Sequence, residues 1–209
     1  MKPNHQTSQS ISLVCPFCEH EQKGLVYPVI DLKANPTLKL GLLTDSLFFV
    51  TCEACAKQFE VIHEMLVLDE DNTYAIFLAP DFKGNHFDNP EVSNFPGYRL
   101  RLVSSVQELK EKILLFAEGL DDKTIELCKL YILMQMENKA CSLLFSGHQV
   151  VEGLLLFSVF NEKGESFQSL SCEEGLYGKL FARAQEFTPD QTNFSRIDAN
   201  WAYTAIASI

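Results

Sequence analysis

The chain has 209 residues, 46% of them hydrophobic, which is enough apolar material for the core of one domain or of two small ones. Its formal net charge of −11 is shared by both halves of the chain, and nucleic-acid affinity depends largely on Lys and Arg at phosphates, so we do not expect DNA or RNA as the main ligand. No stretch approaches the roughly 18 apolar residues of a membrane span, residues 1–10 lack an apolar leader, and seven cysteines fit a reducing compartment, so we expect a cytoplasmic protein.

The first 79 residues predict a succession of short strands. Alternating apolar residues separated by turn-forming residues indicate most of them, and Asn35-Pro36 begins a helical turn. In chain order, the expected elements are strands over residues 11–14 and 24–32, a helical turn over 37–41, a strand over 47–51, and a hairpin of residues 59–67 and 73–78 with its turn at 69–72.

Two Cys-x-x-Cys pairs, Cys15-Pro16-Phe17-Cys18 and Cys52-Glu53-Ala54-Cys55, are separated by 33 residues of this β-rich segment. Each pair brings two sulfurs together in a tight turn, and four thiolates form the tetrahedral site that structural zinc prefers. The separation exceeds the roughly 15 to 20 residues of a usual zinc ribbon. Glu19 and Ala56 also stand where glycine commonly follows the second cysteine. We predict a closed zinc site with the ligands Cys15, Cys18, Cys52 and Cys55.

Residues 80–97 are rich in Pro, Gly, Asn and Asp and predict a linker or mobile loop. Beyond them the pattern becomes mainly helical. The first expected elements are a strand over residues 98–103 and a helix capped by Ser105 and Glu108 and stopped at Gly119. A second helix, capped by Asp121 or Asp122, runs to Met136, and a hairpin of residues 150–160 and 164–170 follows it. The last elements are a helix capped by Ser171 and Glu174 that ends at Thr188-Pro189, and a strand or clip over residues 197–209.

These elements predict an α+β protein with a β-rich zinc-ribbon module over residues 11–79, the linker over 80–97 and an α+β module over 98–209. The helix over residues 122–136 is apolar on almost every side at its centre, so we expect it to be buried on several sides. The C-terminal hairpin and the helix over 176–187 could cover it within the chain. Alternatively, a homodimer or a partner protein could bury the exposed face of this helix, because large apolar patches usually mark interfaces.

The chain resembles the CpXC domain family of bacterial proteins, named for two Cys-Pro-x-Cys motifs. The resemblance spans roughly residues 11–136 and is carried by the two cysteine pairs, Asn35-Pro36, and the segments at 98–103, 111–113 and 119–126, with a weaker echo at 197–202. It implies a fold and marks Cys15, Cys18, Cys52 and Cys55, but it marks no catalytic residue. Glu53 stands where the second motif has its proline.

Several functions remain open. The leading hypothesis is a cytoplasmic interaction or adaptor protein with structural zinc and no catalytic site. A zinc-linked redox sensor or thiol-dependent enzyme is the alternative, since Cys15-Pro16-Phe17-Cys18 alone resembles a glutaredoxin site, although residues 19–24 do not predict the required helix. A nucleic-acid-binding ribbon is the third. A deep polar pocket with convergent titratable groups would distinguish an enzyme from an adaptor. Cys128, Cys141 and Cys172 are expected to act as small hydrophobic side chains.

Overall fold

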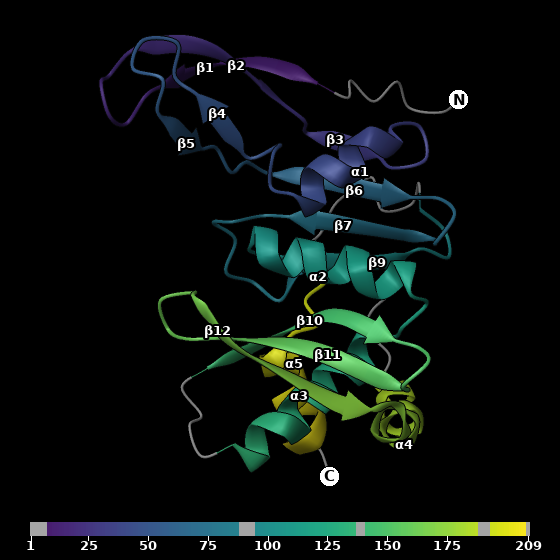
Figure 1. Ribbon diagram of the computed structural model, residues 1–209. Helices are drawn as coiled ribbons and strands as arrows, with labels where there is room; N and C mark the ends of the chain where they lie inside the picture. Colours follow the sequence, from purple (N-terminus) through teal and green to yellow (C-terminus); the bar gives the residue numbers. More distant parts are fainter. Residues whose placement is uncertain (1–7, 88–94, 137–140, 188–192, 208–209) are drawn as a thin grey trace.

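The structure is a computed structural model that describes residues 8–87, 95–136, 141–187 and 193–207. Figure 1 shows two hairpins at one end, a central sheet with α1 and α2, and a three-stranded sheet with α3, α4 and α5 at the other end, which confirms the α+β class. The strands are β1 (Gln9–Val14), β2 (Glu21–Val26), β3 (Val29–Asp31), β4 (Phe49–Thr51), β5 (Gln58–Glu60), β6 (Met65–Asp69), β7 (Tyr74–Leu78), β8 (His86–Phe87), β9 (Arg99–Val103), β10 (Ser142–Gln149), β11 (Leu154–Phe160), β12 (Ser166–Glu173) and β13 (Phe194–Ser195). The helices are α1 (Pro36–Leu43), α2 (Val106–Ala117), α3 (Asp122–Gln135), α4 (Glu174–Gln185) and α5 (Ala199–Ala207).

The central sheet has the strand order β3-β6-β7-β9-β13-β8. Its strands β6 and β7 form the predicted hairpin and are buried on both faces, which explains why their sequences are almost continuously apolar. Alternate side chains belong to two separate clusters: Met65 and Ile76 pack into the main core, whereas Leu66 and Ala75 pack into a second core on the opposite face.

Strands from both sides of residues 80–97 meet in this sheet. Strand β9 pairs directly with β7, and β8, which lies within residues 80–97, joins the sheet through β13. The predicted module boundary therefore falls inside the span of one sheet. Residues 88–94 of that predicted linker lie outside the described residues.

Helix α2 lies between the central sheet and the three-stranded sheet β10-β11-β12 (Figure 1). Its predicted cap is confirmed, because the Ser105 side chain accepts a hydrogen bond from the backbone N–H of Glu108. Its apolar residues Val106, Leu109, Ile113 and Phe116 are buried. The helix ends before Gly119, whose φ of +69° is one that glycine adopts without steric cost. Asp121 caps α3 in the same way as Ser105 caps α2.

Several predicted elements are wrong. The strand expected over residues 59–67 is two strands, because β5 pairs with β4 whereas β6 pairs with β3 and β7. The strand expected over 24–32 is likewise divided into β2 and β3, with Pro28 between them. Local alternation indicates extended backbone, but it does not say which sheet each residue joins.

The C-terminal region differs from the sequence-based prediction in three places. Strand β10 was not predicted, and residues 150–153 form the turn that joins it to β11. Ser171 is no cap, because it lies in β12 and α4 begins after Glu173 without a side-chain cap. The tail forms the helix α5, in which the Asp198 side chain accepts the backbone N–H of Trp201. Within the described ranges, none of the helices has the length and apolarity that a bilayer crossing demands.

Candidate functional site

The two cysteine pairs occupy the turns of two hairpins, β1-β2 and β4-β5, at one end of the molecule (Figure 1). Both turns have the same backbone hydrogen bonds. The Cys15 N–H donates to the His20 carbonyl at 2.9 Å, and the Cys52 N–H donates to the Lys57 carbonyl at 2.9 Å. In each turn the residue after the second cysteine donates back to the carbonyl of the first cysteine, at 2.9 Å and 3.0 Å. The two pairs therefore have equivalent local structures.

The residue after each pair adopts a left-handed backbone conformation. The φ angles are +59° at Glu19 and +57° at Ala56. The position that usually favours glycine is therefore left-handed in both turns although neither residue is glycine, and this costs about 1–2 kcal/mol per residue. The departure from glycine noted in the sequence does not change the geometry of the turns.

The two turns bring all four cysteine sulfurs into one cluster. Their Sγ atoms lie within 4.8 Å of one another, with Cys15 and Cys55 at 3.8 Å and Cys18 and Cys52 at 3.6 Å. Four sulfurs placed about 2.3 Å from a central zinc ion in a tetrahedron are roughly 3.8 Å apart. No disulfide joins them. The cluster thus has the donor atoms and the spacing to hold one metal ion.

Electrostatics within the cluster favour a cation. Hydrogen bonds from the backbone amides of Cys55 and Ala54 lower the pKa of Cys52 to about 6, although desolvation opposes them. A backbone hydrogen bond at His20 lowers the pKa of Cys18, but desolvation and the neighbouring thiols raise it to about 12. Thiolates this close repel one another, and a divalent cation removes that repulsion.

Gln22 connects the two hairpins beside the cluster. Its side-chain amide donates to the Thr51 carbonyl at 3.1 Å and accepts the backbone N–H of Glu53 at 2.9 Å. Its side chain is buried. Sequence reasoning missed Gln22, because the partner hairpin lies about thirty residues further along the chain and nothing local indicates the contact.

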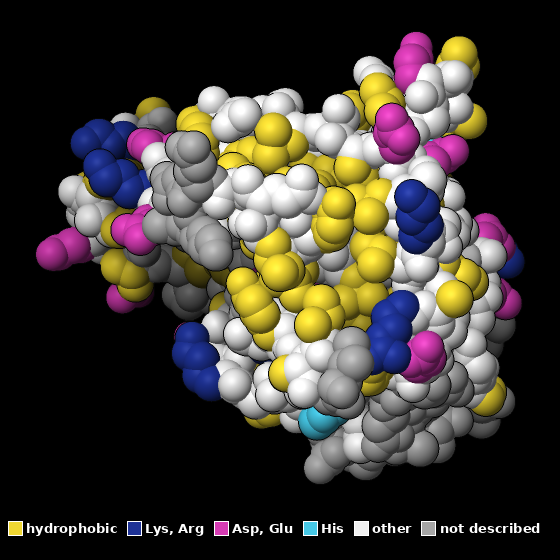
Figure 2. All heavy atoms as spheres, turned by 90° about the horizontal axis from the view of Figure 1, so that it is seen from below, with side chains coloured by type: hydrophobic (Ala, Val, Ile, Leu, Met, Phe, Trp, Pro, Cys, Tyr) yellow, Lys and Arg dark blue, Asp and Glu magenta, His cyan; other side chains and the backbone are white. Residues whose placement is uncertain are grey.

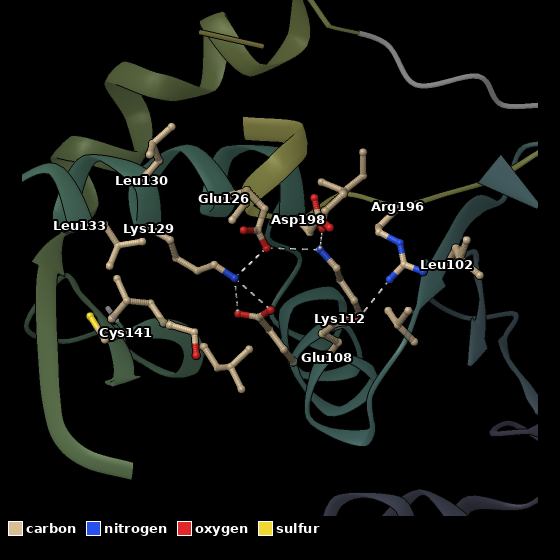
Figure 3. Close-up of a pocket in the computed structure, with 17 residues that line it drawn as sticks. Leu102, Glu108, Lys112, Glu126, Lys129, Leu130, Leu133, Cys141, Arg196 and Asp198 are labelled. Carbon is tan, nitrogen blue, oxygen red and sulfur yellow. Dashed lines mark hydrogen bonds and ion pairs between the residues drawn. The ribbon is translucent and has the colours of Figure 1, made fainter. Parts of the chain in front are cut away.

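A second candidate site is a cavity of about 240 Å³ that lies among α2, α3, the first residues of β10 and residues 196–199. Figure 3 shows Glu126 between Lys129 and Lys112, with Arg196 and Asp198 near the same cavity. The titratable side chains that line it are Glu108, Glu111, Lys112, Glu126, Lys129, Arg196, Asp198 and Cys141.

Six of the charged side chains in and beside this cavity form a chain of alternating sign. All six are less than a tenth exposed. In order they are Glu111, Lys129, Glu126, Lys112, Asp122 and Arg101. The N–O distances between successive members are 3.1, 2.7, 3.7, 3.0 and 2.7 Å.

The two carboxylates that contact Lys112 have opposite pKa shifts. Burial raises the pKa of Glu126 to about 7 despite the nearby lysines. Burial also acts on Asp122, but Arg101 and Lys112 outweigh it and hold the pKa of Asp122 well below its usual range. Titratable groups with pKa values driven apart in a cavity are typical of functional sites.

The sequence contains a signal for this site in the helix over residues 122–136. Residues 122–136 predict a helix buried on several sides, so charged residues at its centre must also be buried, and a buried charge requires a partner. Glu126 and Lys129 are such residues. Their partners on α2 cannot be identified from spacing, because they depend on how the two helices pack.

A family model described as CpXC protein matches residues 13–129, which include both cysteine pairs and every member of the buried chain of charges. No curated protein and no solved structure matches this sequence.

Proposed function

This chain belongs to the CpXC protein family, and from that premise we propose that it is a cytoplasmic zinc-ribbon protein that acts by binding another protein. The sulfur spacing of the four-cysteine cluster carries the metal part of the proposal. No reaction is assigned to the ribbon, because four thiolates complete the tetrahedral coordination of zinc and leave no position for a substrate.

Zinc is the ion that best suits this cluster. Four thiolates in tetrahedral arrangement select zinc or an iron–sulfur cluster. An iron–sulfur cluster places several atoms between the thiolates, whereas the sulfurs here are 3.6 and 3.8 Å apart within each contacting pair, which suits a single ion. The seven cysteines all lie among the described residues and form no disulfide there, which suits a reducing compartment such as the cytoplasm.

Metal analysis of the purified chain tests the zinc site. We expect one zinc per chain in the wild type and in Cys172→Ser, a matched control outside the ribbon. We expect its loss in Cys52→Ser, which removes a buried ligand candidate. A folded, metal-free wild-type chain with four reduced ribbon thiols would falsify the zinc proposal.

The interaction role rests on apolar side chains that the chain leaves uncovered. The first nine residues of α3 are buried by the rest of the chain, whereas Tyr131 and Met134 near its end are 48% and 64% exposed. Tyr203 and Ile206 of α5 are also exposed. Figure 2 shows hydrophobic side chains gathered over the middle of the face at the α3 and α5 end. Exposed apolar patches of this kind mark interfaces.

A solution mass measurement tests the interface. We expect either a dimer or a complex with a partner protein that Met134→Lys weakens, because the lysine would place a charge inside the apolar contact. Val151→Lys changes a more exposed apolar residue on the turn between β10 and β11 and serves as the control. Equal effects of the two substitutions on association would remove the end of α3 from the interface.

A further inference from the structure

The cavity between α2 and α3 combines apolar walls with buried charges. Its apolar lining includes Leu102, Leu130, Leu133, Leu143 and Ile197, and its volume is about 240 Å³. An apolar cavity of about 150 Å³ holds benzene, so this one has room for a somewhat larger molecule. The polar groups in it determine which class of molecule that is.

The two lysines of the cavity use almost all of their hydrogen-bond donors within the protein. An ammonium group has three donors. Lys129 Nζ lies 3.1 Å from both oxygens of Glu111 and 2.7 Å from Glu126 Oε1. Lys112 Nζ lies 2.8 Å from a backbone carbonyl oxygen, 3.0 Å from Asp122 and 3.7 Å from Glu126. Lys129 therefore has no donor left for an anion, and Lys112 has two donors occupied and its ammonium flanked by the carboxylates of Asp122 and Glu126.

The third cation, Arg196, is occupied in a similar way. Its Nε donates to the Gly84 carbonyl at 3.3 Å, its Nη2 to the Phe82 carbonyl at 3.1 Å and its Nη1 to the Ser104 hydroxyl at 2.9 Å. These bonds tie residues 82–84 to the segment before α5. They direct three nitrogens of the guanidinium to acceptors of the protein itself.

The carboxylates of the cavity, in contrast, have unused acceptors. Glu111 also receives the backbone N–H of Phe145 at 2.6 Å, but Glu126 Oε2 accepts no hydrogen bond from the described residues. Among the described residues, the Asp198 carboxylate accepts one hydrogen bond, from the backbone N–H of Trp201 to Oδ1, and its Oδ2 accepts none. Four carboxyl groups and three cations line the cavity, so its balance is negative when Glu126 is ionised, above its pKa of about 7. The cavity can thus accept hydrogen bonds from a ligand and repels an anion.

We propose that this cavity binds a small organic cation, a protonated primary amine whose ammonium group donates to Glu126 Oε2 and whose hydrocarbon body lies against Leu130, Leu133 and Leu143. The ammonium group supplies the donor that this carboxylate oxygen lacks. The apolar walls exclude water around the pair and strengthen the attraction between the charges. This site is separate from the cysteine cluster, so it stands or fails independently of the zinc proposal.

Titration calorimetry of the full-length chain as purified, at about pH 8, above the pKa of about 7 of Glu126, with three molecules of similar shape tests the proposal. Benzylamine carries the cation, benzyl alcohol is its neutral counterpart and benzoate its anionic one. We expect benzylamine to bind at least tenfold more tightly than either. Glu126→Gln should remove this tenfold preference, whereas Glu162→Gln, on the exposed turn after β11, should keep it.

A second variant keeps the test decisive if Glu126→Gln does not fold. Leu133→Trp fills the cavity from the end of α3 and leaves every charged residue in place, so we expect it to abolish benzylamine binding while circular dichroism stays unchanged. Benzoate binding as tight as benzylamine binding, unchanged amine binding in the folded Leu133→Trp variant, or no amine binding at millimolar concentration would each overturn the proposal.

Discussion

Lys129 Nζ lies 2.7 Å from Glu126 Oε1, one helical turn earlier on α3, and both side chains are buried. An exposed pair at this spacing contributes about 0.2–0.5 kcal/mol. Inside the protein the two charges instead depend on each other, because removing one leaves the other buried without its partner. The stability of the packing between α2 and α3 therefore depends on the buried charges around α3.

Lys129→Met tests this dependence. The substitution leaves Glu111 and Glu126 without their shared cation, so we expect the free energy of unfolding to fall by about 3–5 kcal/mol in urea titrations. Lys33→Met is the matched control, since Lys33 pairs with Glu70 and Asp71 at the exposed surface, and we expect no measurable change in stability. Equal losses in the two variants would contradict the prediction.

The raised pKa of Glu126 predicts a pH dependence of stability. Glu126 has a pKa of about 7 in the folded chain and about 4.3 when unfolded, so the folded state binds more protons between these values. Its contribution is complete below about pH 4 and is lost as the pH rises through 7. The charged groups around Glu126 are Lys112, Glu111, Lys129, Asp122, Arg101, Arg196 and Asp198.

Urea unfolding of the wild type and Glu126→Gln between pH 4.5 and 7.5 measures this effect. We expect the stability of the wild type to fall relative to the variant as the pH rises, by about 1–3 kcal/mol across the range. Two curves that remain parallel would show that Glu126 does not titrate in this interval.

Ala56→Gly should stabilise the second cysteine turn. Ala56 has a φ of +57°, where an alanine is strained and a glycine is not, so we expect a gain of about 1 kcal/mol in the zinc-loaded protein. Ala54→Gly, in the same turn but without a positive φ, should instead lose up to about 1 kcal/mol. Urea titration measures the free energy of unfolding of both variants. A loss of stability in both would contradict the strain inferred at Ala56.

Zinc removal should unfold the hairpins and spare the central sheet. Among the described residues, the apolar cluster beside the cysteines has Cys15, Cys52 and Phe59 as its buried members, so metal binding, about 10–16 kcal/mol in small zinc modules, must supply most of the stability there. Hydrogen exchange after chelation should show lost protection at Cys52 and retained protection at Val67, in the main core. Unchanged protection at Cys52 would contradict a structural role for the metal.

Nucleic acids should bind weakly. The net charge is −11, with 28 Asp and Glu against 17 Lys and Arg, and four of these cations, Arg101, Lys112, Lys123 and Lys129, are buried, so the surface should repel phosphates. We expect dissociation constants no better than about 10⁻⁴ M for single-stranded and duplex nucleic acids at physiological salt. Submicromolar binding with a steep dependence on salt would support a nucleic-acid-binding ribbon instead.

The features that the sequence alone predicted correctly are local ones. A Cys-x-x-Cys turn spans four residues, so the spacing of Cys15 and Cys18 already implies that their sulfurs converge. The cap of α2 at Ser105 depends on residues only three apart, as does the cap of α3 at Asp121. Each of these structures is stabilised by contacts within one turn of the chain, which a pattern of residues can reveal.

Tertiary structure alone decided the features that join distant segments. The break of residues 59–67 into β5 and β6 depends on which partner strand each residue meets. The pairing of β9 with β7 depends on the path of the chain between them. The burial of Glu126 and Lys129 depends on α2 packing against α3. Charged side chains resemble surface residues in a sequence, and only packing shows that their partners balance the cost of removing them from water.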